Sequence, residues 1–195
     1  TATMECKSSM GLVVAAPTAG SCGVLPGTCL AAAEFLGLDE DEAVKALLAA
    51  GIIGVFIARG ATFSAEIGGC QAECGSASGM SAAGLVTLAG GSLEQAVAAA
   101  SMALQSSLGM ICDPIANRVE APCLGKNAMA AANALSAANM ALAGFDPLIP
   151  FDEVLAAMDQ VGRSLPHALR CTGLGGLSLT KTSRAIEERL KQARK

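Results

Sequence analysis

The sequence is poor in aromatic residues: among its 195 residues there is no Trp and no Tyr, and aromatics make up 3% of the chain. Hydrophobic residues nevertheless account for 52%, and charged residues for only 15%. A core without large rings must be built from Ala, Leu, Val, Ile and Met against Gly, which favours close packing of helix on helix. The length suits one large domain.

Positive charge is also scarce. The chain carries 13 Lys and Arg against 17 Asp and Glu, a net charge of -4. Its cationic run, Lys191, Arg194 and Lys195, stands at the C-terminus, where it complements a helix dipole. This balance excludes a basic face for nucleic acid, and we expect no nucleic-acid partner.

Residues 8–33 hold no charge, a stretch long enough to span a bilayer. Pro17, Pro26 and several glycines interrupt it, so we expect a deeply buried loop followed by a helix, and no membrane partner. The N-terminus has no basic region followed by an apolar run and a cleavage site, so no signal peptide is predicted. Because the chain opens without Met and without a helix start, we expect a fragment of a longer protein.

Histidine is almost absent. His167 is alone, follows Pro166, and is expected to be a surface or capping residue. The chain has no Ser/His/Asp set and no P-loop. Its 8 cysteines, in a large apolar chain, are not typical of a secreted disulfide scaffold and indicate a reduced, cytoplasmic protein. Cys6, Cys29 and Cys171 are interpreted as small hydrophobic residues.

The pattern predicts an all-α fold: a single helical domain over 1–195, with a central buried apolar helix and Gly/Pro-rich active-site loops. No alternating strand pattern persists, and the apolar run at 12–16 is brief. The stretch 71–88, uncharged after Glu73, is typical of a helix surrounded on all sides. The predicted helices cover 39–59, 71–88, 92–108, 126–142, 151–165 and 179–194.

Three cysteines stand in segments unlike ordinary core. Cys70 lies among glycines, and Cys112 and Cys123 are each flanked by proline. Three sulfurs without an obvious fourth suggest an open coordination position, as in catalytic metal sites. Their spacing matches neither a zinc ribbon nor a bacterial ferredoxin. Cys74 follows Cys70 by one helical turn, and spacing leaves open whether it is a fourth ligand or a packing residue.

The segment Ala-Pro-Thr-Ala-Gly-Ser-Cys-Gly at 16–23 is rich in hydroxyls and in glycine amides. If a helix begins at 24–27, these amides form a cradle for an anion such as a carboxylate; the alternative is a tight packing turn. Lys126, close to Cys123, is a candidate base or carboxylate partner, or simply a solvated lysine at a helix start.

Six motifs together carry a family resemblance. They are Ser-Ser-Met-Gly (8–11), the 16–23 segment, Gly-Cys-Gln-Ala-Glu (69–73), Cys-Asp-Pro-Ile-Ala (112–116), Glu-Ala-Pro-Cys-Leu-Gly-Lys-Asn (120–127) and Thr-Gly-Leu-Gly-Gly (172–176). In this order, over nearly the whole chain, they resemble the catalytic α domain or α subunit of the iron–sulfur L-serine dehydratases.

The resemblance implies a [4Fe–4S] cluster held by Cys70, Cys112 and Cys123, without PLP. Its reaction would be β-elimination of L-serine to pyruvate and ammonia, a step of amino-acid degradation that feeds gluconeogenesis. The base is unknown, with Lys126 a weak candidate. Candidate substrate-binding residues are Ser8, Ser9, Thr18, Gly20, Ser21, Gly23 and Asn127.

The resemblance also implies an oligomer and a β subunit or domain with a Ser-rich, His-containing motif. That motif, an N-terminal stretch of the α domain and the C-terminal cysteine of some single-chain members are missing from this sequence. Two other functions stay open: a cluster-dependent L-cysteine desulfidase, and a non-enzymatic zinc–thiolate or scaffold module.

Overall fold

The structure is a computed structural model that describes residues 1–116, 118 and 120–193, with nothing said of the side chain at 120. The described residues form helices and no strand, so the all-α prediction is confirmed. The α-helices are α1 (Ala2–Ser8), α2 (Val24–Phe35), α3 (Glu40–Gly60), α4 (Ala65–Gly68), α5 (Ser76–Leu88), α6 (Leu93–Gln105), α7 (Glu120–Leu142), α8 (Phe151–Ser164) and α9 (Lys181–Gln192). Three short turns are η1 (Gln71–Gly75), η2 (His167–Leu169) and η3 (Gly176–Leu179).

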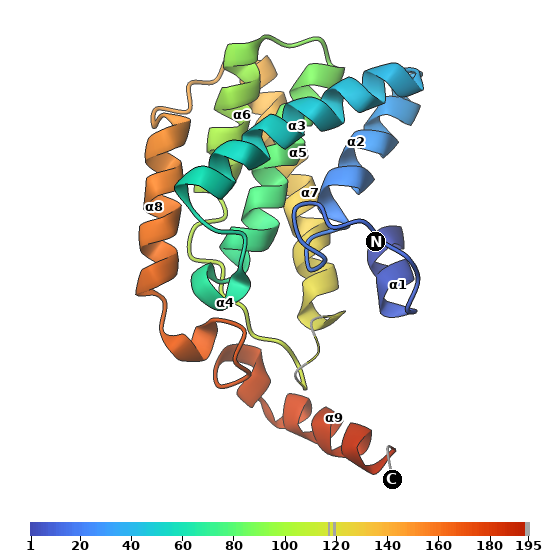
Figure 1. The fold of residues 1–195 in the computed structure, drawn as a ribbon, viewed down its shortest axis with the longest axis vertical. Helices are drawn as coiled ribbons and strands as arrows, with labels where there is room; N and C mark the ends of the chain where they lie inside the picture. Colours follow the sequence, from blue (N-terminus) through green and yellow to red (C-terminus); the bar gives the residue numbers. More distant parts are fainter. Residues whose placement is uncertain (117, 119, 194–195) are drawn as a thin grey trace.

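Helix α5 is the centre of the molecule, as its composition predicts. It packs against α2, α3, α6 and α7, and nearly all its residues are buried (Figure 1). The predicted helix over 71–88 is present, but its first turn, η1, is π-helical. Such wide turns are frequent at functional sites, and this one directly follows Cys70.

The outer helices begin where side chains satisfy free backbone amides. Asp39 accepts from Glu42 N–H at 3.0 Å at the start of α3. Ser92 and Gln95 form the predicted capping box of α6. Each cap satisfies donors that lack a partner within the helix, so the starts of α3 and α6 agree with the sequence.

Alanine fills the contacts between helices. Five buried examples are Ala46 and Ala50 on α3, Ala99 on α6, and Ala134 and Ala137 on α7. Small side chains let helix backbones approach closely, so a nearly ring-free chain still builds one contiguous core.

Helix α7 begins earlier than the sequence predicts. Its first turn includes Ala121 and Pro122, whose backbone is not helical, and regular helix follows. From the sequence, we predict that this helix begins only at Lys126, after a loop that contains Pro122. Pro122 instead stands close to the start of the helix, where a proline costs no internal hydrogen bond. Cys123 is thereby placed in the first regular turn.

The expectation of a deeply buried loop in residues 8–33 is wrong. Met10, Leu12 and Val14 are 93%, 95% and 80% exposed, and only the part from Ser21 onward enters the core. The stretch does not form one continuous helix, since α2 covers only Val24–Phe35. We call these three exposed apolar side chains, which alternate along one segment, the apolar patch.

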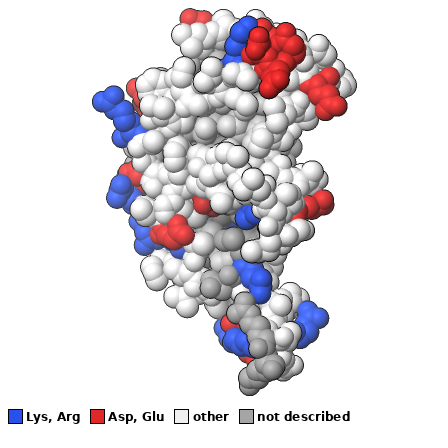
Figure 2. Space-filling model, turned by 45° about the vertical axis from the view of Figure 1, so that its right-hand side comes forward, with Lys and Arg blue, Asp and Glu red and all other residues white. Residues whose placement is uncertain are grey.

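Helix α3 is the one described helix whose length and composition would allow it to cross a membrane. Its most apolar stretch is 33% buried here, against α2, α5 and α8. Figure 2 shows acidic side chains gathered at the end of the molecule where α3 begins, with Glu40, Asp41 and Glu42 in its first turn. The middle of the face shown in Figure 2 is largely uncharged.

Candidate active site

Cys70 is held by its neighbour Gln71. The buried Gln71 side chain donates to Met158 O of α8 at 2.8 Å and accepts from Gly109 N–H at 2.8 Å. The backbone N–H of Gln71 also donates to Met110 O at 3.0 Å. These bonds fix the turn that starts α5 against the segment leading to Cys112.

Cys112 is held by backbone bonds to a distant part of the chain. Its N–H donates to Leu169 O at 2.9 Å, and its C=O accepts from Cys171 N–H at 3.0 Å. The Cys171 thiol lies within hydrogen-bonding reach of Cys112. The interpretation of Cys171 as a mere packing residue, apart from the site, is therefore wrong: a contact between the 112 and 169–171 segments brings it there.

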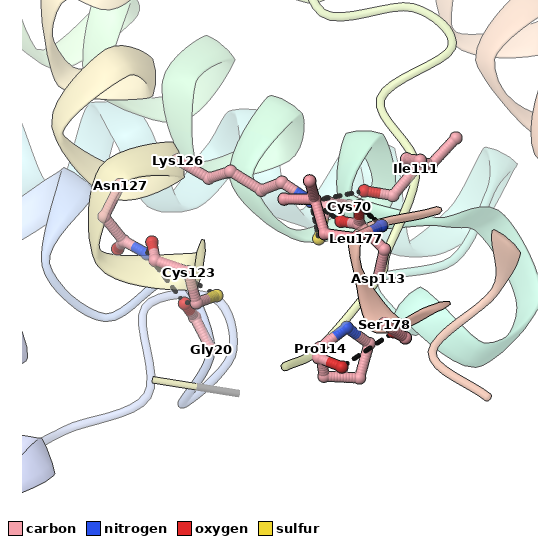
Figure 3. Close-up of polar contacts among 10 residues, drawn as sticks. All are labelled: Gly20, Cys70, Ile111, Asp113, Pro114, Cys123, Lys126, Asn127, Leu177 and Ser178. Atoms are coloured by element: carbon pink, nitrogen blue, oxygen red, sulfur yellow. Dashed lines mark hydrogen bonds and ion pairs between the residues drawn. The ribbon is translucent and has the colours of Figure 1, made fainter. Parts of the chain in front are cut away.

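Cys123 and Asn127 join α7 to the 16–23 loop (Figure 3). Cys123 Sγ donates to Gly20 O at 3.2 Å, and Asn127 Nδ2 donates to the same oxygen at 2.8 Å. Asn127 Oδ1 accepts from Gly23 N–H at 3.1 Å. The sequence-predicted residues Gly20, Gly23 and Asn127 therefore lie together beside Cys123.

The three predicted thiols converge. Cys70, Cys112 and Cys123 all line one small pocket. A hydrogen bond from Cys70 lowers the pKa of Cys112, and bonds from Cys70 and then Cys74 lower the pKa of Cys123 to about 3. The pKa values of Cys70 and Cys74, the donors, are raised. Within this group Cys112 and Cys123 are therefore the thiols that lose a proton most readily, and the thiolate is the form that binds metals.

A small pocket of about 10 Å³ lies between these thiols. It is lined by Cys70, Cys112, Asp113, Pro114, Pro122, Cys123 and Lys126. We call this the thiol pocket. Cys74 is not among these lining residues. It is buried, with its Sγ 3.8 Å from Asn127 Nδ2, and both packing and ligation remain compatible with that position.

Lys126 is not a solvated lysine. Its Nζ donates to Asp113 Oδ1 at 2.8 Å and to Ile111 O at 2.7 Å, and lies 3.8 Å from Cys70 Sγ (Figure 3). Burial lowers the Lys126 pKa, but Asp113 and the neighbouring thiols outweigh burial, so the net pKa is raised. Lys126 therefore stays protonated and places a positive charge beside the thiols.

Asp113 joins this charge to the C-terminal segment. Its Oδ2 accepts from Leu177 N–H at 2.9 Å, and a Cβ on Gly176 would collide with its side chain. Gly176 has φ +59, a conformation that glycine adopts without strain. The Gly-Gly of the 172–176 motif thus lets η3 close over Asp113.

The hydroxyl candidates separate into two groups. Thr18 Oγ1 lies 3.0 Å from Ser21 Oγ and accepts from Ser21 N–H at 3.2 Å, within the loop that reaches Cys123. Ser8 donates to Met4 O within α1, and Ser8 and Ser9 are exposed. The structure places Thr18 and Ser21 by the site and leaves Ser8 and Ser9 outside it.

Helix α2 begins at Val24, as the predicted anion cradle requires, but three of the cradle's amides are already bonded. The N–H groups of Ser21, Gly23 and Val24 donate to Thr18 Oγ1, Asn127 Oδ1 and Ser21 O. This favours the packing-turn alternative for the loop backbone.

Sequence reasoning missed two charged residues near the thiol pocket. Glu73 follows Cys70 by one helical turn, a spacing that could have revealed it. Burial raises its pKa to about 6. Lys7, on α1, has a buried Nζ, and no sequence signal singles it out. His167 is exposed and Cys29 is buried in the core, as expected; Cys6 is exposed.

The donor set suits an iron–sulfur cluster by its chemistry. Among the described residues no group of three His, Cys, Asp or Glu is arranged around one point to hold a single metal ion. In a cluster each thiolate binds a different iron atom, so one shared point is not required. Converging free thiols, two of them with a lowered pKa, and a neighbouring ammonium are the features that such an anionic cluster needs.

Comparison with known sequences identifies the family of the chain. Residues 1–178 match the family described as "Serine dehydratase alpha chain". The "Probable L-serine dehydratase, alpha chain" of Bacillus subtilis is 49% identical over 97% of this chain, and the "L-serine dehydratase, alpha chain" of Peptoniphilus asaccharolyticus is 50% identical over 94%. The chain spans 63% of the length of each of these two relatives. "L-serine dehydratase 1" of Escherichia coli is 38% identical over 90% of the chain, which spans 39% of that protein.

Fold and site together define an all-helical protein whose helix starts and loops bring three thiols to one pocket. Within that class, the chain belongs to the serine dehydratase alpha chain family.

Proposed function

We propose that this chain is the catalytic alpha part of an L-serine dehydratase that deaminates L-serine to pyruvate and ammonia by β-elimination. The observation that carries the proposal is the convergence of Cys70, Cys112 and Cys123 from three separate segments onto one pocket. In the overall reaction serine loses its Cα proton and its Cβ hydroxyl as water. The resulting aminoacrylate is hydrolysed to pyruvate and ammonia.

Cys70, Cys112 and Cys123 are the proposed ligands of a [4Fe–4S] cluster. When bound, a cluster with three thiolate ligands supplies an iron atom free to act as a Lewis acid toward the serine hydroxyl. The pocket of about 10 Å³ has room for roughly one water molecule, so the thiols must move apart to accept a cluster.

The chain's own residues supply charge and order around this site. Lys126, kept protonated by Asp113, stabilises negative charge on the thiols and is unsuited to remove the Cα proton. Asn127 holds the 16–23 loop against Cys123, which shields one side of the pocket from water. A group other than Lys126 therefore accepts the Cα proton.

A β chain is the proposed partner, because two of the relatives are named alpha chains and the chain spans only part of their length. The exposed apolar patch of Met10, Leu12 and Val14 stands next to the site loop and is the surface we assign to that contact. We expect the active unit to be this chain with its missing segments and partner.

The test is anaerobic reconstitution of the full-length alpha chain with its β chain, iron and sulfide. We expect a brown complex, with iron and sulfide in equal amounts, that converts L-serine to pyruvate. A colourless complex containing zinc would instead support the thiolate scaffold. Sulfide release from L-cysteine without pyruvate from L-serine would support the desulfidase.

A further inference from the structure

Lys7 lies at the edge of the thiol pocket. Helix α1 packs through Met4 against Cys22 and Cys123, and Met4 also reaches Gly23. Lys7 follows Met4 by three positions and shares its face of the helix. Its Nζ is buried and makes no hydrogen bond within the described part of the chain.

The Lys7 charge acts on groups beside the pocket. Burial raises the pKa of Cys22, and the nearby Lys7 ammonium opposes that rise. Lys7 therefore lies near Cys22, on the helix that packs against Cys22 and Cys123 through Met4.

Glu73 offers the opposite charge from the other side of that loop. A Cβ on Gly20 would fall against the Glu73 carboxylate, so this carboxylate lies against the loop backbone. Among the described residues Glu73 belongs to no ion pair, although the Lys7 charge reaches it. The two charges are close enough to interact, yet more than 4.0 Å apart.

Leaving a buried ammonium unpaired is costly, so such a group calls for a partner, which can be a water molecule, an ion or a ligand. Three of the loop's amides are already bonded, so the side chains supply the free charge here. Opposite charges held apart match a ligand that carries both charges itself.

We propose that Lys7 and Glu73 bind a zwitterionic α-amino acid: the Lys7 ammonium takes its α-carboxylate and the Glu73 carboxylate takes its α-ammonium. The assignment rests on the proposed function and adds the residues that orient the substrate. With both charged groups held beside the 16–23 loop, the side chain of the amino acid is left free to face the thiol pocket.

The experiment uses the reconstituted full-length alpha–β complex and three probes. L-serine carries both charges, L-serinamide lacks the carboxylate, and 3-hydroxypropanoate lacks the ammonium. Calorimetry measures the Kd of each probe for wild type, Lys7→Met, Lys7→Arg and Glu73→Gln. Lys45→Met, which removes an exposed ammonium on α3, is the matched control.

We expect Lys7→Met to weaken L-serine binding about 10- to 100-fold, the range for a lost charged hydrogen bond, and to leave L-serinamide within about twofold. Lys7→Arg should restore most of the affinity. Glu73→Gln should weaken L-serine and L-serinamide alike and spare 3-hydroxypropanoate. The unliganded Lys7→Met complex should melt no lower than wild type, because it loses an unpaired buried charge.

Equal weakening of L-serine and L-serinamide by Lys7→Met, or no weakening of either, would overturn the assignment. So would a lower melting temperature of that variant, which would indicate a structural role. In those cases wild type still deaminates L-serine and the proposed function stands. If wild type neither binds nor deaminates L-serine, the proposed function fails, and this assignment with it.

Discussion

At the scale of single residues, Asp113 connects the parts of the site. It accepts from Lys126 of α7 and from the backbone of Leu177, and it directly follows Cys112. One carboxylate thus links a thiol, a cation and the C-terminal segment. The Asn127 side chain likewise links the 16–23 loop to Cys123 through hydrogen bonds to both. Both are nearly fully buried, so their bonds are protected from competition with water.

Replacing Cys112 by Ser should remove the cluster and the L-serine activity together. A serine hydroxyl is a hard and mostly protonated ligand, and so binds iron weakly beside thiolates. Iron and sulfide content and pyruvate formation measure the effect. Cys29→Ser is the matched control: Cys29 is buried in the core away from the pocket, so the change should cost stability only, about 1–3 kcal/mol. Equal activity of Cys112→Ser and wild type would reject the proposed mechanism.

Glu73 should make the stability of the unliganded chain fall as pH rises from about 4.5 to about 6. Burial raises its pKa from 4.5 to about 6, so folding favours the protonated form. The stabilisation is fully present below pH 4.5 and is lost as pH rises through about 6. The free energy of unfolding of Glu73→Gln should therefore exceed that of wild type by about 1–2 kcal/mol at pH 8 and equal it at pH 4. Urea unfolding across this range measures it; a difference independent of pH would contradict it.

At the scale of elements, helix starts and turns position the chemistry. Cys70 stands before the π-helical turn that begins α5, Cys123 stands in the first regular turn of α7, and Cys112 is bonded to the segment after η2. The start of a helix is rigid on one side and open on the other, so thiols placed there can face a shared pocket. The 171–176 turn contacts Asp113, one of the residues that line this pocket, at Gly176.

Two glycines of that turn should respond differently to alanine. Gly173 and Gly176 both have positive φ. A Cβ added at Gly173 would meet open space, whereas a Cβ added at Gly176 would collide with the Asp113 side chain. Gly173→Ala should cost only the backbone strain, about 1–2 kcal/mol. Gly176→Ala should in addition displace Asp113 and reduce the iron retained by the reconstituted complex. Thermal unfolding and iron counts separate the two effects, and equal iron retention by both variants would argue against a positioning role for Gly176.

At the scale of the whole molecule, the helices form a bundle around α5, while α9 extends away from it (Figure 1). The exposed apolar patch at Met10, Leu12 and Val14 adjoins the site loop at the side of α1. An apolar patch beside a polar site is typical of an interface that completes the site.

Leu12→Asp should weaken association with the β chain at least about tenfold, because an interface would have to bury the new charge. Analytical ultracentrifugation of the mixed chains measures this. Phe35→Asp is the control, since Phe35 is 90% exposed at the far end of α2. Association lowered equally by both variants, or by neither, would exclude the patch as the contact surface.

The sequence by itself determines the helices and the identity of the thiols. Caps at Asp39 and Ser92 and the uncharged stretch after Glu73 act locally, so α3, α5 and α6 follow from neighbouring residues alone. Glycine and proline around Cys70, Cys112 and Cys123 likewise distinguish these three segments from the regular core, although Cys123 itself stands in regular helix.

Tertiary structure alone decides what lies next to what. The neighbourhood of Cys171 and Cys112 depends on a bond between backbone segments that are distant in sequence, and the exposure of Met10 depends on which surfaces the bundle covers. The burial of Lys7 and Glu73 beside one loop has the same origin. Local propensity fixes dihedral angles over a few residues, whereas burial and charge environment depend on long-range packing that no short pattern encodes.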